Sequence, residues 1–461
     1  MKCCLILLMI GLLAGCARFR PAPLSPARSA AAFDARSLTD TNLLAYVASN
    51  GPASGGKSPV WDLDALTLVG FYYQPALAEA RAQWALARAG QITAGERPNP
   101  SVTFTPEYDS TTPPPWILGG TWDIPIETAG KRGRRQEEAQ HLAEAARWNL
   151  VGTMWQTRSA VRTALLDLYA ARETESRLAA QAGAQSNVVQ LLEGQLAAGS
   201  VAAFDVTQAR ITLANVQLAI QDARHQRLEA RGKLADALGL PARALDGVVL
   251  DFSCFRSVPA ALPAPQVRRQ AALHRADIRA ALAEYAARQS ALQLEIARQY
   301  PDIHLSPGYQ LDQTDNKWSL GVTVTLPILN QNQGPIAEAE AQRKQAAAHF
   351  LAVQARAMGE IDRALTGYRA AREQTVGADT LVQELQARMA AVRARQQAGE
   401  LEPLAAASAR VEFASGMLAR LDARLKVQRA LGQLEDASQS TFKVTPTMLE
   451  PALGQGKESA K

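Results

Sequence analysis

The sequence predicts a mainly α-helical fold in which one unit, made of a helix, two strands, a very long helix and a return helix, occurs twice. The first observation is a repeat: PSVTFTPEY at 100–108 recurs as PDIHLSPGY at 301–309, and WILGGTWDIPI at 116–126 recurs as WSLGVTVTLPI at 318–328. Matching motifs at a constant separation of about 200 residues indicate a duplicated unit. The second observation is the long segment after each strand pair, which is rich in Ala, Leu, Gln and Arg and lacks a strong helix breaker.

Each unit is expected to hold the same elements in the same order. Prolines and turn-forming residues bound the strands, and the spacing of apolar residues marks the helices. The expected organisation is a lipoprotein signal peptide at 1–15, a lipid anchor and extended tether at 16–58, a first repeat at 59–240 (helix 75–95, strands about 100–108 and 116–126, long helix about 133–198, return helix about 203–238), an equatorial connector at 241–272, a second repeat at 273–438 (helix 275–298, strands about 301–311 and 318–328, long helix about 335–398, return helix about 403–437) and a flexible tail at 439–461.

The first segment is typical of an export signal. One lysine precedes an apolar run at 5–13, which is too short to span a bilayer. The residues LAGC at 13–16 resemble the bacterial lipobox, which predicts that Cys16 becomes the lipidated first residue. An ordinary signal peptide cut elsewhere is the alternative. Only Cys254 follows Cys16, so no internal disulfide is expected.

Composition and motifs argue against several functions. The 49 Lys and Arg nearly balance the 44 Asp and Glu and are interleaved with them, which does not predict a nucleic-acid surface. The five histidines show no ligand spacing, so no metal site or cofactor is expected. The sequence shows no catalytic nucleophile, base or phosphate-binding loop, so no enzymatic activity is expected.

The two long helices set the expected shape. At 1.5 Å per residue each would form a rod of roughly 100 Å, which is too long for an ordinary globular domain. Val411, Ala414 and Leu418 recur at intervals of three and four residues, the spacing of packed, coiled helices. Each rod is expected to turn back at Gly199 or Gly399, where a positive φ would end the helix.

Every predicted strand has one apolar and one polar face. In the strand at 318–328, Trp318, Leu320 and Val322 alternate with Ser319 and Thr323. A half-buried soluble sheet would show the same alternation. The export signal and the adjoining rods favour a membrane β-barrel with lipid outside and water inside.

Four strands cannot close a barrel, and an open edge is not tolerated in lipid. Two copies would give eight strands and an interior filled by side chains, whereas three would give twelve strands and an aqueous lumen. The strands therefore predict a homotrimer with a 12-stranded β-barrel.

Three motifs link this sequence to a known family. They are the strand ends PIETAGKRGRR at 125–135 and LPILNQNQGPIAEAEA at 326–341 and the helix turn AGSVAAFDVTQAR at 198–210. The match covers essentially the whole mature chain. The sequence resembles the TolC-type outer-membrane efflux proteins, and its GKRG and NQNQG junctions are similar to the CzcC heavy-metal efflux branch. The resemblance implies a trimeric, lipid-anchored channel in the outer membrane of a Gram-negative bacterium. A periplasmic α-helical barrel would continue the channel.

The resemblance also implies a function and partners. The channel would be the passive exit duct of a tripartite efflux pump, fed by an inner-membrane RND-type proton-driven pump through a periplasmic adaptor, and would conduct heavy-metal cations. The exit duct of a multidrug efflux or secretion system is the alternative within transport. A structural periplasmic adaptor lipoprotein is the alternative of another class, but adaptors have one helical hairpin, whereas two are predicted here.

Candidate site residues follow from the same resemblance. The adaptor contact would lie at the helix turns, at Gly199, Ser200, Gly399 and Glu400, although these glycines could also simply end helices. Acidic residues after the second turn often form the family's periplasmic constriction, but Ala405 and Ser408 stand there. The candidate gate is therefore Asp205, which keeps the matching place in the first unit, together with Glu402. The candidate strand-to-helix junctions are Pro125, Gly130, Gly133, Pro327 and Gly334.

Overall fold

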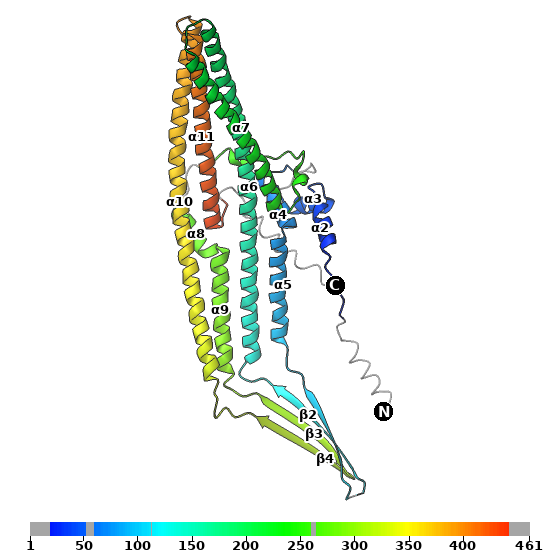
Figure 1. Cartoon of the computed structure of the whole chain (residues 1–461). Helices are drawn as coiled ribbons and strands as arrows, with labels where there is room; N and C mark the ends of the chain where they lie inside the picture. Colours follow the sequence, from blue (N-terminus) through cyan, green and yellow to red (C-terminus); the bar gives the residue numbers. More distant parts are fainter. Residues whose placement is uncertain (1–18, 52–59, 112, 260–263, 442–461) are drawn as a thin grey trace.

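The computed structural model describes residues 19–51, 60–111, 113–259 and 264–441, which form an elongated molecule (Figure 1). A layer of long helices makes up most of its length, and a four-stranded sheet lies at one end. The predicted signal peptide at 1–15, Cys16 and the tail from 442 lie outside the described residues. In the described part of the chain, no helix combines the length and apolar character needed to cross a membrane.

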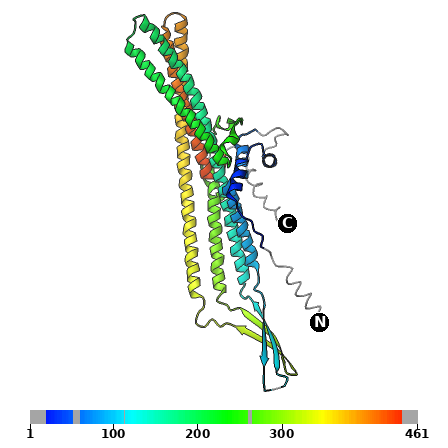
Figure 2. The same cartoon turned by 45° about the vertical axis from the view of Figure 1, so that its right-hand side comes forward.

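Two helices run unbroken along the helical layer. They are α6 (Lys131–Ala197) and α10 (Gln333–Gln397), which begin two residues before the predicted starts of 133 and 335. The return helices are α7 (Ala203–Leu238) and α11 (Pro403–Ser438), and they pack on α6 and α10 as two helical hairpins. Both views place the turns of these hairpins at the end opposite the sheet (Figure 2).

The other two rods are each made of two helices stacked end to end. Helix α5 (Pro75–Gly95) continues the line of α7 toward the sheet, and α9 (Ala276–Ala297) continues the line of α11 (Figure 1). Side chains satisfy the carbonyls at these breaks, as the last turn of a helix requires. Gln74 Nε2 donates to the Asp236 and Ala237 carbonyls, and the Arg275 guanidinium donates to the Ala437 carbonyl at 2.6 Å.

The described part of the segment predicted as an extended tether at 16–58 contains two helices, which corrects that prediction. Within the described residues, α2 (Pro26–Asp34) is capped by Ser25, and α3 (Thr41–Asn50) is capped by Asp40. These side chains accept hydrogen bonds from the first free amides of each helix, which stabilises its N-terminal end. Arg36 lies between α2 and α3 and donates to the carbonyls of Tyr73 and Gly239, so this segment binds the break between α7 and α5.

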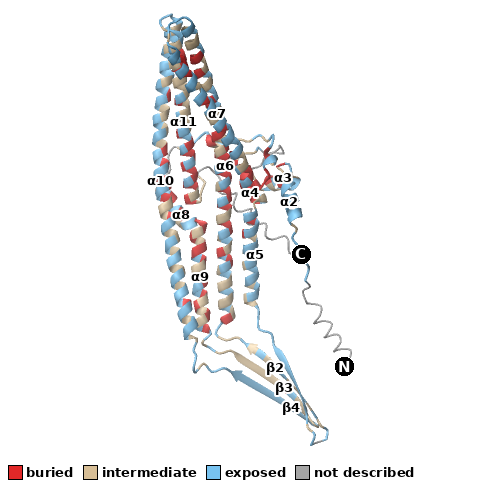
Figure 3. Ribbon diagram, viewed as in Figure 1, coloured by how far each residue is buried: buried red, intermediate tan, exposed pale blue. Residues whose placement is uncertain are grey.

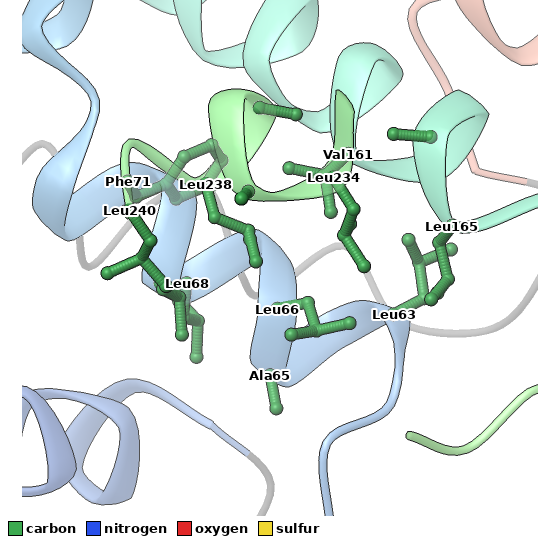
Figure 4. Packing of buried hydrophobic residues seen from close by; sticks show 14 of the residues in the cluster. Leu63, Ala65, Leu66, Leu68, Phe71, Val161, Leu165, Leu234, Leu238 and Leu240 are labelled. Atoms are coloured by element: carbon green, nitrogen blue, oxygen red, sulfur yellow. The ribbon is translucent and has the colours of Figure 1, made fainter. Parts of the chain in front are cut away.

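The main core lies beside these breaks. Helix α4 (Leu63–Tyr73) packs its apolar side chains, Leu66, Leu68 and Phe71 among them, against Val161 and Leu165 of α6 and Leu234 and Leu238 of α7 (Figure 4). The connector between the repeats is not wholly irregular, because it contains two short 3-10 turns (Ala242–Leu245 and Ser253–Phe255) and the start of α8 (Ala264–His274).

A buried charged cluster joins the two hairpins. Arg158 and Arg162 of α6 each lie 3.3 Å from the Glu435 carboxylate of α11, and all three side chains are buried. Burial lowers the pKa of Arg162, and the charge of Glu435 opposes that shift. Gln428 accepts from Arg162 and donates to the carbonyls of Phe255 and Ser257, which attaches the connector to the cluster.

The sheet has the order β1-β2-β3-β4, with every neighbouring pair antiparallel. Its strands are β1 (Ser101–Tyr108), β2 (Trp116–Ile126), β3 (Ile303–Asp312) and β4 (Asp315–Val324). The predicted strand at 318–328 therefore ends early, at Val324, three residues before Pro327. It also begins early, because Gln313, with a φ of 56°, allows a tight turn where a loop at 310–317 was expected.

The break between α7 and α5 allows a matched test. Gly239 and Gly247 both have a φ of 70°, but a Cβ on Gly239 would lie 2.9 Å from the Tyr73 carbonyl oxygen, whereas one on Gly247 would meet nothing within 4 Å. Gly247→Ala is expected to cost about 1 kcal/mol from the positive φ alone. Gly239→Ala is expected to cost about 2 kcal/mol more, because backbone atoms must separate. Urea unfolding followed by helical circular dichroism measures both, and equal costs would contradict the stacking described here.

Candidate functional site

The sheet exposes one continuous apolar face. Cross-strand partners in an antiparallel pair lie on the same face, and the register pairs Val102 with Trp122, and Tyr309 with Trp318. Trp318 is 81% exposed and Phe104 is 78% exposed. The exposed members of this face are Val102, Phe104, Tyr108, Trp116, Leu118, Trp122, Ile124, Ile126, Tyr309, Trp318, Leu320, Val322 and Val324. Figure 3 draws the strands almost entirely as exposed or intermediate.

The opposite face of the sheet is polar. The register pairs Thr103 with Thr121 and His304 with Thr323 on this face. His304 Nδ1 lies 3.0 Å from Asp123 Oδ1, within hydrogen-bond distance. In the described part of the chain β1 pairs only with β2, and β4 only with β3, so one edge of each outer strand is open.

A set of polar contacts fixes the sheet to the helices. Lys131, the first residue of α6, is buried and donates to the Tyr300 carbonyl at 2.7 Å and to Asp302 at 2.8 Å. The Thr128 amide donates to the same carboxylate at 2.9 Å. Arg135 donates to Glu127 and to the Glu96 carbonyl. Two basic side chains of the run GKRGRR therefore make structural contacts, Lys131 with the segment between α9 and β3 and Arg135 with Glu127 and the residue after α5.

The predicted junction residues have different roles. Gly130 has a φ of 71° and directly precedes α6, so it forms the sharp turn from the strand into the helix. Its counterpart in the second repeat is Asn332, with a φ of 64°, a residue that was not among the predicted junction residues. Asn is among the few residues that adopt this conformation readily. Gly133 and Gly334 lie inside the first turns of α6 and α10, where an added Cβ would meet nothing within 4 Å.

Pro125 and Pro327 mark the ends of the strands nearest the helices. Pro125 lies within β2 opposite His304, whereas Pro327 follows β4.

The predicted adaptor-contact residues lie at the two hairpin turns. Gly199 and Gly399 have φ values of 74° and 78° and follow the C-cap residues of α6 and α10. Ser200 donates its hydroxyl to the Gln195 carbonyl, and Glu400 accepts from Arg395 at 3.3 Å.

The candidate gate residues lie on different hairpins. The Asp205 carboxylate accepts from the Ala202 amide at the start of α7. Glu402 precedes α11 and accepts from Gln195 Nε2 of α6 at 3.3 Å, so it links the two hairpin tips. Both remain candidates, and no group of three or more His, Cys, Asp or Glu residues within the described ranges is placed to hold a metal ion.

A comparison with protein families identifies the chain. Residues 73–240 and 267–438 match the family described as "Outer membrane efflux protein". The chain belongs to this outer membrane efflux protein family. The two matched ranges coincide with the two structural units, each with its strand pair and helical hairpin. The resemblance to TolC-type proteins drawn from the sequence is confirmed.

Individual relatives agree with the family. The chain is 30% identical over 232 residues to the cobalt-zinc-cadmium resistance protein CzcC of Cupriavidus metallidurans; the match covers 50% of this chain and about half, 54%, of the relative. The outer membrane protein VceC of Vibrio cholerae has a similar fold, with a TM-score of 0.67 at 20% identity over 83% of this chain and 97% of VceC. The CmeC outer membrane channel of Campylobacter jejuni gives a TM-score of 0.66 at 14% identity over 95% of this chain and 98% of CmeC.

Neighbouring basic residues at the start of α6 provide a matched test of the junction. Lys131→Ala removes both contacts of a buried ammonium group and leaves Asp302 with fewer donors, so we expect a loss of about 1–3 kcal/mol in the free energy of unfolding. Arg132 is half-buried and its side chain makes no hydrogen bond or ion pair within the described residues, so Arg132→Ala is expected to change it by less, about 0.5 kcal/mol. Urea titration of both variants checks this, and similar losses would show that Lys131 has no special role.

Proposed function

We propose that this family member is the outer-membrane exit duct of a tripartite efflux pump. The observation that carries the proposal is the sheet with an exposed apolar face, a polar opposite face and two open edges. Water does not favour an apolar face of this size, and exposed patches of this kind mark membrane or protein contacts. Lipid against the apolar face and water against the polar face would satisfy both.

The open edges of β1 and β4 require other strands. In lipid every backbone amide and carbonyl needs a partner, so the edges of one copy would pair with those of further copies. A homotrimer would close a 12-stranded barrel with room for an aqueous lumen. The four rods of each copy would form a wall of the helical tunnel that continues from the barrel into the periplasm.

The proposed arrangement places the parts of the chain in the cell envelope. Cys16 would carry the lipid that anchors the chain in the outer membrane of a Gram-negative bacterium. The hairpin tips lie at the end of the molecule farthest from the sheet and would meet a periplasmic adaptor at Gly199, Ser200, Gly399 and Glu400 (Figure 1). An RND-type proton-driven pump in the inner membrane would supply the substrate.

We infer that the substrate is a heavy-metal cation. The relative named as a cobalt-zinc-cadmium resistance protein supports this assignment. The duct itself needs no metal-binding cluster, because selection would reside in the pump. Deletion of the gene is expected to raise sensitivity to cobalt, zinc or cadmium, measured as growth inhibition. Sensitivity to dyes or detergents alone would contradict the metal assignment and favour a multidrug duct.

Adjacent residues of β4 test the membrane orientation. Leu320→Arg would place a charge on the apolar face at a cost of about 2–4 kcal/mol in lipid, whereas Ser319→Arg would place the same charge toward the lumen at little cost. Urea titration of tryptophan fluorescence in phospholipid vesicles measures the free energy of folding of each variant. Equal costs, or a larger cost for Ser319→Arg, would exclude the proposed orientation.

The candidate gate gives a test of conduction. Three copies of Asp205 and Glu402 around a narrow mouth would attract cations and repel anions. The double variant Asp205→Ala/Glu402→Ala is therefore expected to lose cation selectivity, measured as the reversal potential across a planar bilayer under a salt gradient. The control Glu373→Ala/Glu384→Ala removes the same charge from exposed positions on the shaft of α10. Unchanged selectivity in the first double variant would refute the gate.

A further inference from the structure

The two hairpin tips differ in charge at matching positions of the repeat. With Gly199 over Gly399, Glu193 matches Arg393, and Arg210 matches Arg410. The first hairpin therefore has a carboxylate facing an arginine across its two helices, whereas the second has two arginines at the equivalent places. The duplicated geometry makes this a comparison of like sites.

In the first hairpin the charges are paired. Arg210 Nη2 of α7 lies 2.6 Å from Glu193 Oε1 of α6, and its Nε lies 3.0 Å from the same oxygen. The ion pair connects α6 and α7 close to the turn at Gly199. An exposed ion pair of this kind adds little stability, but it leaves neither charge open to a partner.

In the second hairpin the two arginines line a groove. Arg393, Gln396, Gln397 and Arg410 border a hollow of about 390 Å³ between α10 and α11, and this set is called the arginine groove below. Both arginines are exposed, and in the described part of the chain neither makes an ion pair with an acidic side chain. The tip of the second hairpin thus presents two guanidinium groups on one small surface.

The acidic side chains of both tips are already engaged. On the second hairpin, Glu400 pairs with Arg395, Glu412 pairs with Arg388, and Glu402 accepts from Gln195. On the first hairpin Glu193 pairs with Arg210, and Asp205 caps α7. The acids nearest the tips of a neighbouring copy would be engaged in the same way, which favours a carboxylate from a different protein.

We propose that the arginine groove is the docking site for a carboxylate of the partner that meets the hairpin tips, an Asp or Glu on the helical tip of the periplasmic adaptor. The proposal rests on the proposed function and names the side chains of one tip that would bind the adaptor. Two guanidinium groups bind a carboxylate through several charge-assisted hydrogen bonds. The glutamines at 396 and 397 add amide groups that fit the backbone or side chains of a helix end. The first hairpin, with its charges paired, would contribute shape but no such contact.

The repeat itself supplies the decisive variant. Arg393→Glu converts the second tip to the arrangement of the first, in which the new carboxylate pairs with Arg410, so the hairpin is expected to fold as before. Docking of an acidic partner is expected to fall about tenfold or more, because one cation is lost and the other is occupied. Arg369→Glu makes the same charge change at an exposed position of α10, roughly 35 Å from the groove at 1.5 Å per residue, and is the control.

The measurement uses the full-length chain in cells, with the photo-crosslinking residue p-benzoylphenylalanine placed at Gln397. The expected adduct joins the chain to another polypeptide at a helix carrying Asp or Glu, identified by mass spectrometry. Its yield should fall in the Arg393→Glu background and persist in the Arg369→Glu background. Replacing the identified acid by Gln should lower the yield in the wild-type background and cause no further fall in the Arg393→Glu background.

Other outcomes overturn the proposal. These are an adduct only with a second copy of this chain, no adduct at all, or an equal yield in the two charge-reversed backgrounds. Conductance of the purified chain in planar bilayers separates this result from the proposed function. Conducting channels with an unaffected adduct would reject the arginine groove alone, whereas a wild-type chain that conducts no current would reject the duct itself.

Discussion

The main constraint on this molecule is that its sheet has apolar surface and backbone hydrogen-bonding groups for which the described part of the chain offers no partner. A single copy leaves an apolar face exposed and the outer edges of β1 and β4 unpaired, and neither water nor lipid accepts both features. The helices address a different need, since their packed faces are buried within one chain around Leu66, Leu165 and Leu234. The ion pair between Lys131 and Asp302 fixes the sheet to the helical layer. The proposed trimer, membrane position and duct all follow from this division between a self-sufficient helical layer and an incomplete sheet.

The two repeats have the same turns and helix ends, but different residues stabilise them in each repeat. Both return helices end in a left-handed residue, Gly239 in the first half and Gln439 in the second. The carbonyls at the C-terminal end of α7 accept from Gln74 and Arg36, whereas the Ala437 carbonyl of α11 accepts from Arg275. The turn into each long helix uses Gly130 in one half and Asn332 in the other. A shared backbone geometry thus constrains the conformation at each position more strongly than the residue type.

Sequence alone predicts the parts of this fold that depend on local pattern. The limits of α5 and β2 follow from proline positions and alternation, and the two long helices follow from the absence of breaks. The helices α2 and α3 were missed because a Pro-, Ala- and Ser-rich composition suggested a tether, although Ser25 and Asp40 are ordinary N-cap signals. Contacts such as Lys131 with Asp302, or Arg36 with Gly239, join residues 171 and 203 positions apart and leave no local pattern. The sequence repeat shows that Arg393 stands where the first repeat has Glu193. Only the structure shows that Arg393 and Arg410 line the same groove.

The interrupted rods have a consequence for how such a chain tolerates insertions and deletions. Helices α7 and α11 end near the middle of the molecule, where α5 and α9 begin, whereas α6 and α10 pass that level without interruption. Residues added or removed between α7 and α9, or ahead of α5, therefore do not shift the heptad phase of either continuous helix. These segments can therefore change in length where they lie outside the contacts of Arg36, α4 and Gln428, while the lengths of α6 and α10 stay fixed.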